Sequence, residues 1–203
     1  MITYFKTPRL FRILFPNRTW GFSSTNKIYL TFDDGPHPEI TPWLLDELAR
    51  RGMRATFFCL GENINVYPQV VNRIVVEGHV LAYHGYTHKR NSNRSIKEIR
   101  SDLRSAPQVL TKCYYRPPYG RLSLLKSLGI PSDWRVVMWS WLSYDYDATV
   151  QVDEIVRSAQ ASLVPGDILV FHDNEKTKDR LKEVLPPILD FIEAKGWIAE
   201  GVD

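Results

Sequence analysis

Short apolar runs alternate along this chain with longer segments in which apolar residues recur at helical spacing. This alternation is typical of a β/α architecture, in which parallel strands are buried under helices. The apolar runs predict strands at residues 27–32, 54–60, 79–83, 113–116, 134–139, 167–171 and 196–199. The longer segments predict helices at residues 42–51, 67–77, 95–110, 123–128, 152–163 and 181–194.

Local signals add detail to these elements. Ser95 and Glu98 have the spacing of a capping box at the start of a helix. Two consecutive prolines at 186–187 should kink or interrupt the last helix, because proline removes a backbone donor and clashes with the preceding turn. Cys59 and Cys113 lie in apolar runs, so we expect both to be free thiols in the core.

The N-terminal segment differs from the rest of the chain, because its aromatic and aliphatic residues are interleaved with basic residues and prolines. We interpret residues 1–26 as an N-terminal arm packed over the rest of the fold and residues 27–203 as a single domain. The prolines limit an amphipathic helix in the arm. Contact of the arm with a membrane surface is the alternative interpretation.

The composition and charge of the chain limit the number of domains and the kinds of partner that we expect. The 203 residues are 44% hydrophobic and 24% charged, which favours one globular domain. The formal net charge of +3 comes without a block of basic residues, so no nucleic-acid partner is expected. No apolar run has the length of a signal-peptide core or a membrane span. We therefore expect a cytoplasmic monomer whose membrane contact, if any, is peripheral.

Polar clusters follow the ends of the predicted strands. They are Asp33-Asp34, His84, residues 116–120, residues 140–147 and His172-Asp173. In a β/α barrel these strand ends meet on one face, so residues far apart in sequence share one site. The convergence predicts a catalytic site.

Asp34, His84 and His88 offer three ligands for a metal ion, and the two histidines are one helical turn apart. At the end of a strand one carboxylate can bind a metal while its neighbour reaches the bound water. We therefore assign Asp34 as a ligand and Asp33 as the general base. This combination indicates hydrolysis by metal-bound water.

Three further positions complete the expected chemistry. Arg116 is suited to hold the base carboxylate, and the backbone N–H of Tyr119 is available to a developing oxyanion. His172, at the end of an apolar strand, is the candidate general acid. Asp145 or Asp147 could bond the far ring nitrogen of His172 and keep it protonated. The aromatic residues around them are core or a sugar-stacking wall.

Together these residues resemble the polysaccharide deacetylase family, the NodB-homology domain of carbohydrate esterase family 4. The resemblance covers about residues 27–199 and is carried by four motifs in the family's order: Thr-Phe-Asp-Asp-Gly-Pro at 31–36, His-x-x-x-His at 84–88, Arg-Pro-Pro-Tyr-Gly at 116–120 and Leu-Val-Phe-His at 169–172. It implies a distorted (β/α)7 barrel of the α/β class. It also implies a divalent metal, Zn²⁺ first, with Co²⁺, Ni²⁺ or Mn²⁺ as alternatives.

The resemblance further implies a role for each matching residue. The metal ligands would be Asp34, His84 and His88, and the catalytic residues would be Asp33 as base, Arg116 as its partner, Tyr119 as oxyanion donor, His172 as acid and Asp145 as the residue that tunes it. The substrate pocket would include Pro118, Leu169 and Tyr146.

The chain departs from the family at four places. Tyr83 and Gly85 stand beside the first histidine, where the family usually has Asn and Ser or Thr. Leu142 replaces the first aspartate of the fourth motif, and Tyr146 replaces its tryptophan. Asp145 fits the second aspartate of that motif, which favours it over Asp147.

The expected function is metal-dependent removal of N-acetyl groups from an N-acetylated amino sugar, in glycan, oligosaccharide or lipid-linked form. One alternative is a related hydrolase of C–N or ester bonds, such as a deformylase of a lipid-linked sugar or an O-deacetylase. Another is a non-catalytic domain that binds glycans.

Overall fold

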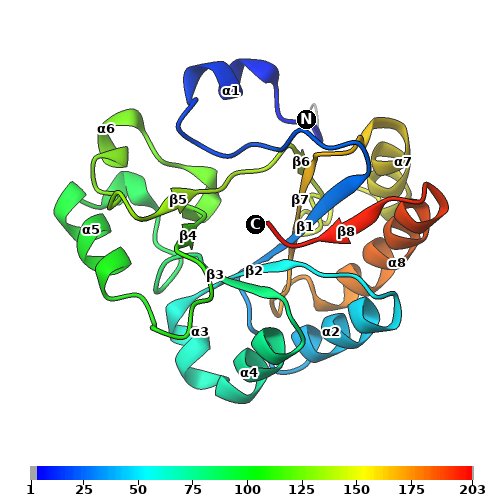
Figure 1. Ribbon diagram of the computed structural model, residues 1–203, viewed down its shortest axis with the longest axis horizontal. Helices are drawn as coiled ribbons and strands as arrows, with labels where there is room; N and C mark the ends of the chain where they lie inside the picture. The colour runs from blue at the N-terminus through cyan, green and yellow to red at the C-terminus, as the bar shows by residue number, and fades with distance from the viewer. Residues whose placement is uncertain (1–3, 203) are drawn as a thin grey trace.

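The protein is described by a computed structural model that covers residues 4–202. Parallel strands form one curled sheet in the order β5-β4-β3-β2-β1-β7-β6, with β8 paired to the start of β1. Figure 1 shows these strands in the middle of the molecule and the helices around them. The fold therefore agrees with the predicted distorted β/α barrel, and its sheet is curled.

Each predicted strand is present, and the structure adds β6. The strands are β1 Lys27–Asp33, β2 Thr56–Cys59, β3 Val80–Tyr83, β4 Tyr114–Tyr115, β5 Arg135–Val136, β6 Trp141–Leu142, β7 Ile168–His172 and β8 Ile198–Glu200. The helices are α1 Arg9–Leu14, α2 Ile40–Arg50, α3 Gly61–Val66, α4 Pro68–Val76, α5 Ile96–Arg104, α6 Leu124–Ser127, α7 Val152–Ser162 and α8 Lys178–Ala194. Short 3₁₀ turns lie at Asn91–Asn93 and Pro118–Gly120.

Successive side chains along β1 and β7 alternate between the hydrophobic core and the opposite face of the sheet. Phe32 and Phe171 are fully buried in the main hydrophobic cluster, which also contains the buried faces of α2 and α8. Burying one such aromatic side chain stabilises the fold by roughly 1.5–3 kcal/mol. The residues that follow them point the other way, because successive side chains of a strand face opposite sides. Asp33 pairs in register with His172, so both polar side chains lie at the same edge of the sheet.

Two helix predictions need correction. The capping box of Ser95 and Glu98 is present, but α5 ends at Arg104 rather than at residue 110, because Pro107 follows shortly and disfavours helix. Helix α8 runs through the prolines at 186–187 without interruption. Its buried leucines, isoleucines and valine continue on both sides of the prolines, and this packing offsets the lost backbone hydrogen bonds.

One cysteine prediction is wrong. Cys59 is buried and Cys113 is exposed, and both are free. The strand expected at 113–116 is shorter than predicted, since β4 begins only at Tyr114. Cys113 therefore lies before the strand, outside the core.

The N-terminal arm joins the two ends of the curled sheet. Lys6 forms a bridge with Trp141 of β6, and Thr19 forms a bridge with Val137, directly after β5. The intervening segment contains α1, which the sequence analysis did not expect. It begins after Pro8 and ends before Pro16, so the prolines bound this helix rather than prevent it. Residues 1–3 of the arm and residue 203 of the domain lie outside the described residues.

None of the helices within residues 4–202 is long and apolar enough to cross a membrane.

Candidate active site

The strand ends bring Asp34, His84 and His88 together. Oδ1 of Asp34 lies 3.6 Å from Nε2 of His84 and 3.3 Å from Nε2 of His88. Their ligand atoms all lie within 4.8 Å of one another. Among the described residues, no donor satisfies this buried Oδ1. A buried carboxylate oxygen that lacks a donor and faces two imidazole nitrogens fits a divalent cation.

Both acidic residues face the site because the chain turns at Asp34. Its φ of +79° ends the strand's alternation, which would otherwise send its side chain away from that of Asp33. The following Gly35 permits close packing in this turn. A Cβ at residue 35 would lie 2.3 Å from Oδ2 of Asp173, a distance at which atoms overlap. The Gly-Pro turn therefore sets the direction of both carboxylates.

The protonation states suit metal binding. Burial raises the pKa of Asp34, but His172, His84, His88 and a hydrogen bond from Asn174 together outweigh it and hold that pKa below its ordinary value. Burial also lowers the pKa of His84, against the attraction of Asp33 and Asp34. An ionised carboxylate and a neutral imidazole are the forms that coordinate a cation.

A main-chain carbonyl orients His84. Its Nδ1 lies 2.7 Å from the carbonyl oxygen of Arg116, which leaves Nε2 to face Asp34. The unusual neighbour Tyr83 is fully buried and donates its hydroxyl to Asp102, 2.7 Å away. The contact that orients His84 therefore does not involve the side chain of Tyr83, and Gly85 has none.

Sequence reasoning missed Asn174. Its Nδ2 donates to Oδ2 of Asp34 at 2.8 Å, so the second oxygen of this carboxylate is fixed. Side chains that hydrogen-bond to a metal ligand orient that ligand and raise the affinity of the site for the metal. The available signal was its position two residues after His172, at the end of β7.

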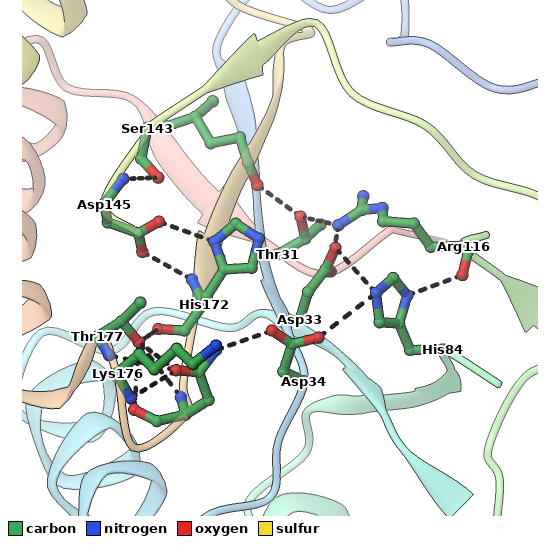
Figure 2. A network of polar contacts seen from close by, with 12 residues as sticks. Thr31, Asp33, Asp34, His84, Arg116, Ser143, Asp145, His172, Lys176 and Thr177 are labelled. Atoms are coloured by element: carbon green, nitrogen blue, oxygen red, sulfur yellow. Dashed lines mark hydrogen bonds and ion pairs between the residues drawn. The ribbon is translucent and has the colours of Figure 1, made fainter. Parts of the chain in front are cut away.

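Asp33 has a different partner from Asp34. Nη1 of the fully buried Arg116 donates to Oδ1 of Asp33 and to Oγ1 of Thr31, each at 2.7 Å. The same guanidinium donates to the carbonyls of Val137 and Met138. Figure 2 shows Asp33 lying between Arg116 and His84. Oδ2 of Asp33 is 3.9 Å from Nε2 of His84, so its free oxygen faces the three candidate ligands.

His172 lies on the other side of the site with Asp145. Oδ1 of Asp145 is 2.7 Å from Nδ1 of His172, and Oδ2 accepts the His172 backbone N–H at 2.8 Å (Figure 2). Burial lowers the pKa of His172, but Asp145 and, less strongly, Asp34 and Asp33 raise it to about 9. Asp147 instead accepts hydrogen bonds from Thr149. The structure therefore pairs Asp145, rather than Asp147, with this histidine.

These groups open onto a cleft of about 700 Å³. Its apolar lining includes Leu142, Val170, Trp139 and Tyr146. The ring of Tyr146 stands edge-on to His172 with centroids 5.1 Å apart. Leu142, in place of an aspartate, makes this part of the cleft apolar.

Two of the residues predicted to line the pocket lie elsewhere. Leu169 is fully buried in the main core, because it alternates with His172 along β7, and Val170 lines the cleft instead. Pro118 is buried and packs near Gly85, where a Cβ would lie 3.6 Å from the proline ring. Tyr119 does line the cleft, and its ring lies 4.5 Å from that of His88. Its φ of +59° and the two preceding prolines fix the main chain there.

Known proteins with similar sequences are named as deacetylases. A peptidoglycan-N-acetylglucosamine deacetylase of Bacillus cereus is 31% identical over 175 residues, 80% of this chain and 63% of that protein. This chain thus spans less than two thirds of that relative. A chitooligosaccharide deacetylase of a Bradyrhizobium species is 37% identical over 166 residues, 77% of this chain and 75% of that protein.

Solved structures share the whole fold. The crystal structure of a peptidoglycan N-acetylglucosamine deacetylase superposes with a TM-score of 0.81 at 27% identity, covering 97% of this chain and 95% of the other. The family model described as polysaccharide deacetylase matches residues 23–128, which include Asp33, Asp34, His84, His88 and Arg116. This chain belongs to the polysaccharide deacetylase family.

Proposed function

We propose that this protein removes the N-acetyl group from an N-acetylated amino sugar of a glycan, an oligosaccharide or a lipid-linked precursor. The relatives named as deacetylases of peptidoglycan and chitooligosaccharides support this substrate class. One observation carries the proposal. The adjacent carboxylates have separate partners, Asp34 facing two histidines and Asp33 bound to Arg116, and His172 lies opposite with a raised pKa.

Asp34, His84 and His88 would hold the divalent metal. Two imidazoles and one carboxylate, with room for a further ligand, are typical of catalytic zinc sites, and Co²⁺, Ni²⁺ or Mn²⁺ also accept these donors. Such an ion would supply Lewis-acid chemistry, which would make the attacking water more acidic.

The remaining residues handle protons and charge. Asp33 accepts a proton from the attacking water, and Arg116 fixes the carboxylate for that task. The backbone N–H of Tyr119 donates to the acetyl oxygen as negative charge collects there. His172 gives its proton to the amide nitrogen as the C–N bond breaks, which releases an amine and acetate. Leu142 and Val170 offer an apolar surface to the acetyl methyl group.

Acetate release from chitooligosaccharides and N-acetylated glycan precursors tests the proposal. The metal-loaded protein should release acetate, and a chelator should stop it. Asp33→Asn should bind the substrate but lose about 10²-fold or more of kcat, because the base is removed and the shape is kept. Asp46→Asn, which alters an exposed carboxylate on α2, is the matched control.

Each alternative gives a different result in this experiment. No acetate from the metal-loaded protein across the panel would refute the proposal. Turnover of only formylated or O-acetylated substrates would assign the related hydrolase. Binding without turnover, equal in the wild type and Asp33→Asn, would indicate a glycan-binding domain.

A further inference from the structure

An exposed apolar surface lies outside the catalytic cleft. It is formed by α1 and α6 and is called the α1–α6 patch: Leu10, Phe11, Ile13, Leu14, Leu124, Leu125 and Leu128. These side chains are between 47% and 74% exposed. Apolar surface gathered in this way marks an interaction site, whereas single exposed apolar residues are ordinary.

Phe11 of α1 packs against the ring of the buried Trp20, with centroids 6.4 Å apart, whereas Leu10, Ile13 and Leu14 are more than half exposed. The arm is anchored before the helix, where the backbone N–H of Thr7 donates to the Ser140 carbonyl at 2.9 Å. It is anchored again after the helix, where the backbone N–H of Thr19 donates to the Val136 carbonyl at 2.9 Å. Between these anchors α1 has no buried residue. The exposed apolar side chains of α1 therefore point to a partner.

The arm directly after α1 lies beside α6. Figure 1 shows α1 and α6 as neighbours at the rim of the molecule. The arm after α1 and the α6 segment line a common hollow of about 540 Å³, to which Phe15, Leu124 and Leu128 contribute. The Arg18 guanidinium donates to the Leu122 carbonyl and thereby ties the arm to the α6 segment.

Basic residues outnumber acidic ones along the two segments that form the patch, although Glu98 of α5 lies close to Lys126. Residues 4–32 contain no aspartate or glutamate, and α1 carries the exposed arginines Arg9 and Arg12. Residues 117–132 around α6 are also free of acidic residues and include Arg121 and Lys126. A second copy of this chain would place basic surface against basic surface. Anionic lipid headgroups above an apolar layer match both the charge and the exposed leucines.

We propose that the α1–α6 patch binds the surface of an anionic lipid membrane. The patch is close to the catalytic cleft along the chain, since Tyr119 and Arg121 line the cleft and α6 begins at Leu124.

Vesicle co-sedimentation of the full chain tests this proposal without any use of catalytic activity. Vesicles of phosphatidylcholine with about one third phosphatidylglycerol should bind the protein, and pure phosphatidylcholine should bind it far less. Leu10→Ser with Ile13→Ser should weaken binding at least about tenfold. Arg9→Gln with Arg12→Gln should weaken it about fivefold for each arginine, an effect that disappears at high salt.

A matched control separates the patch from general hydrophobicity. Val66→Ser with Val76→Ser removes two equally exposed apolar side chains from α3 and α4 and should leave vesicle binding unchanged. All variants should keep the wild-type circular dichroism and thermal unfolding, because the altered side chains are exposed. Two results would overturn the proposal: no vesicle binding by the folded wild type, or equal loss in the control. A third result would assign the patch to a second copy of the chain. In that case the wild type self-associates without binding vesicles, and the Leu10→Ser, Ile13→Ser variant does not self-associate.

Discussion

Replacing Asp145 by asparagine should move the alkaline limit of activity. Asp145 holds His172 through two contacts of 2.7 and 2.8 Å, and it is the main cause of the histidine's raised pKa. Asparagine keeps the shape and removes the charge. Burial, which lowers the pKa of His172, is then opposed only by Asp34 and Asp33, so that pKa should fall from about 9 toward the ordinary 6.5.

The size of the effect follows from the protonated fraction of His172. With a pKa of about 9, roughly nine tenths of the imidazole is protonated at pH 8, against about 3% with a pKa of 6.5. If His172 is the general acid, the variant should lose about 30-fold of kcat at pH 8. Near pH 6 the loss from this cause should shrink to less than about twofold.

Stability should change over the same pH range. The folded-state pKa lies above the 6.5 of an unfolded histidine, so the stabilisation is complete below pH 6.5 and disappears as the pH rises through 9. A difference from 6.5 to about 9 corresponds to about 3 kcal/mol. The difference in unfolding free energy between wild type and Asp145→Asn should therefore shrink by up to about 3 kcal/mol across this window.

Activity is measured as acetate release at saturating substrate from pH 6 to pH 9. Stability is measured by urea unfolding at both ends of this range. Asp147→Asn is the control, since that carboxylate lies two residues away and bonds Thr149 instead. A pH profile of unchanged shape, with activity lowered equally at every pH, would refute the role of Asp145 in keeping His172 protonated.

Two further predictions concern the other pairs of the site. Asn174→Ala removes the donor to Oδ2 of Asp34 and should weaken zinc binding by about 10–100-fold in a competition titration; unchanged affinity would show that Asn174 does not support the ligand. Arg116→Met leaves the buried carboxylate of Asp33 without its ion pair and should lower the unfolding free energy by about 3–5 kcal/mol in urea. A loss below about 1 kcal/mol would contradict that account.

Several features were readable from the sequence because their causes are local. The strand of residues 27–32 is a mostly apolar segment, and the Ser95–Glu98 box caps its own helix. Asp33-Asp34 and His84-x-x-x-His88 carry their chemistry in residue type and spacing. Their position after strand ends was enough to predict that they meet, since parallel strands share one edge.

Other features depended on packing that no local pattern records. Residue type and spacing left Asp145 and Asp147 as alternatives, and only the family resemblance favoured Asp145. In the structure β7 lies beside the loop of Asp145, which pairs this residue with His172. The structure also placed Leu169 in the core and Asn174 on Asp34. Helix α8 passes its prolines because its apolar face is buried on both sides of them.

The sequence by itself determined which chemical groups the protein has and the order in which strands present them. Only the tertiary structure decided which groups are partners. Arg116 reaches Thr31 and Asp33 across more than 80 residues of chain, a contact fixed by β1 and β4 lying in the same curled sheet. Residue type and periodicity are properties of neighbouring residues, whereas the direction and burial of a side chain depend on elements that are distant in sequence.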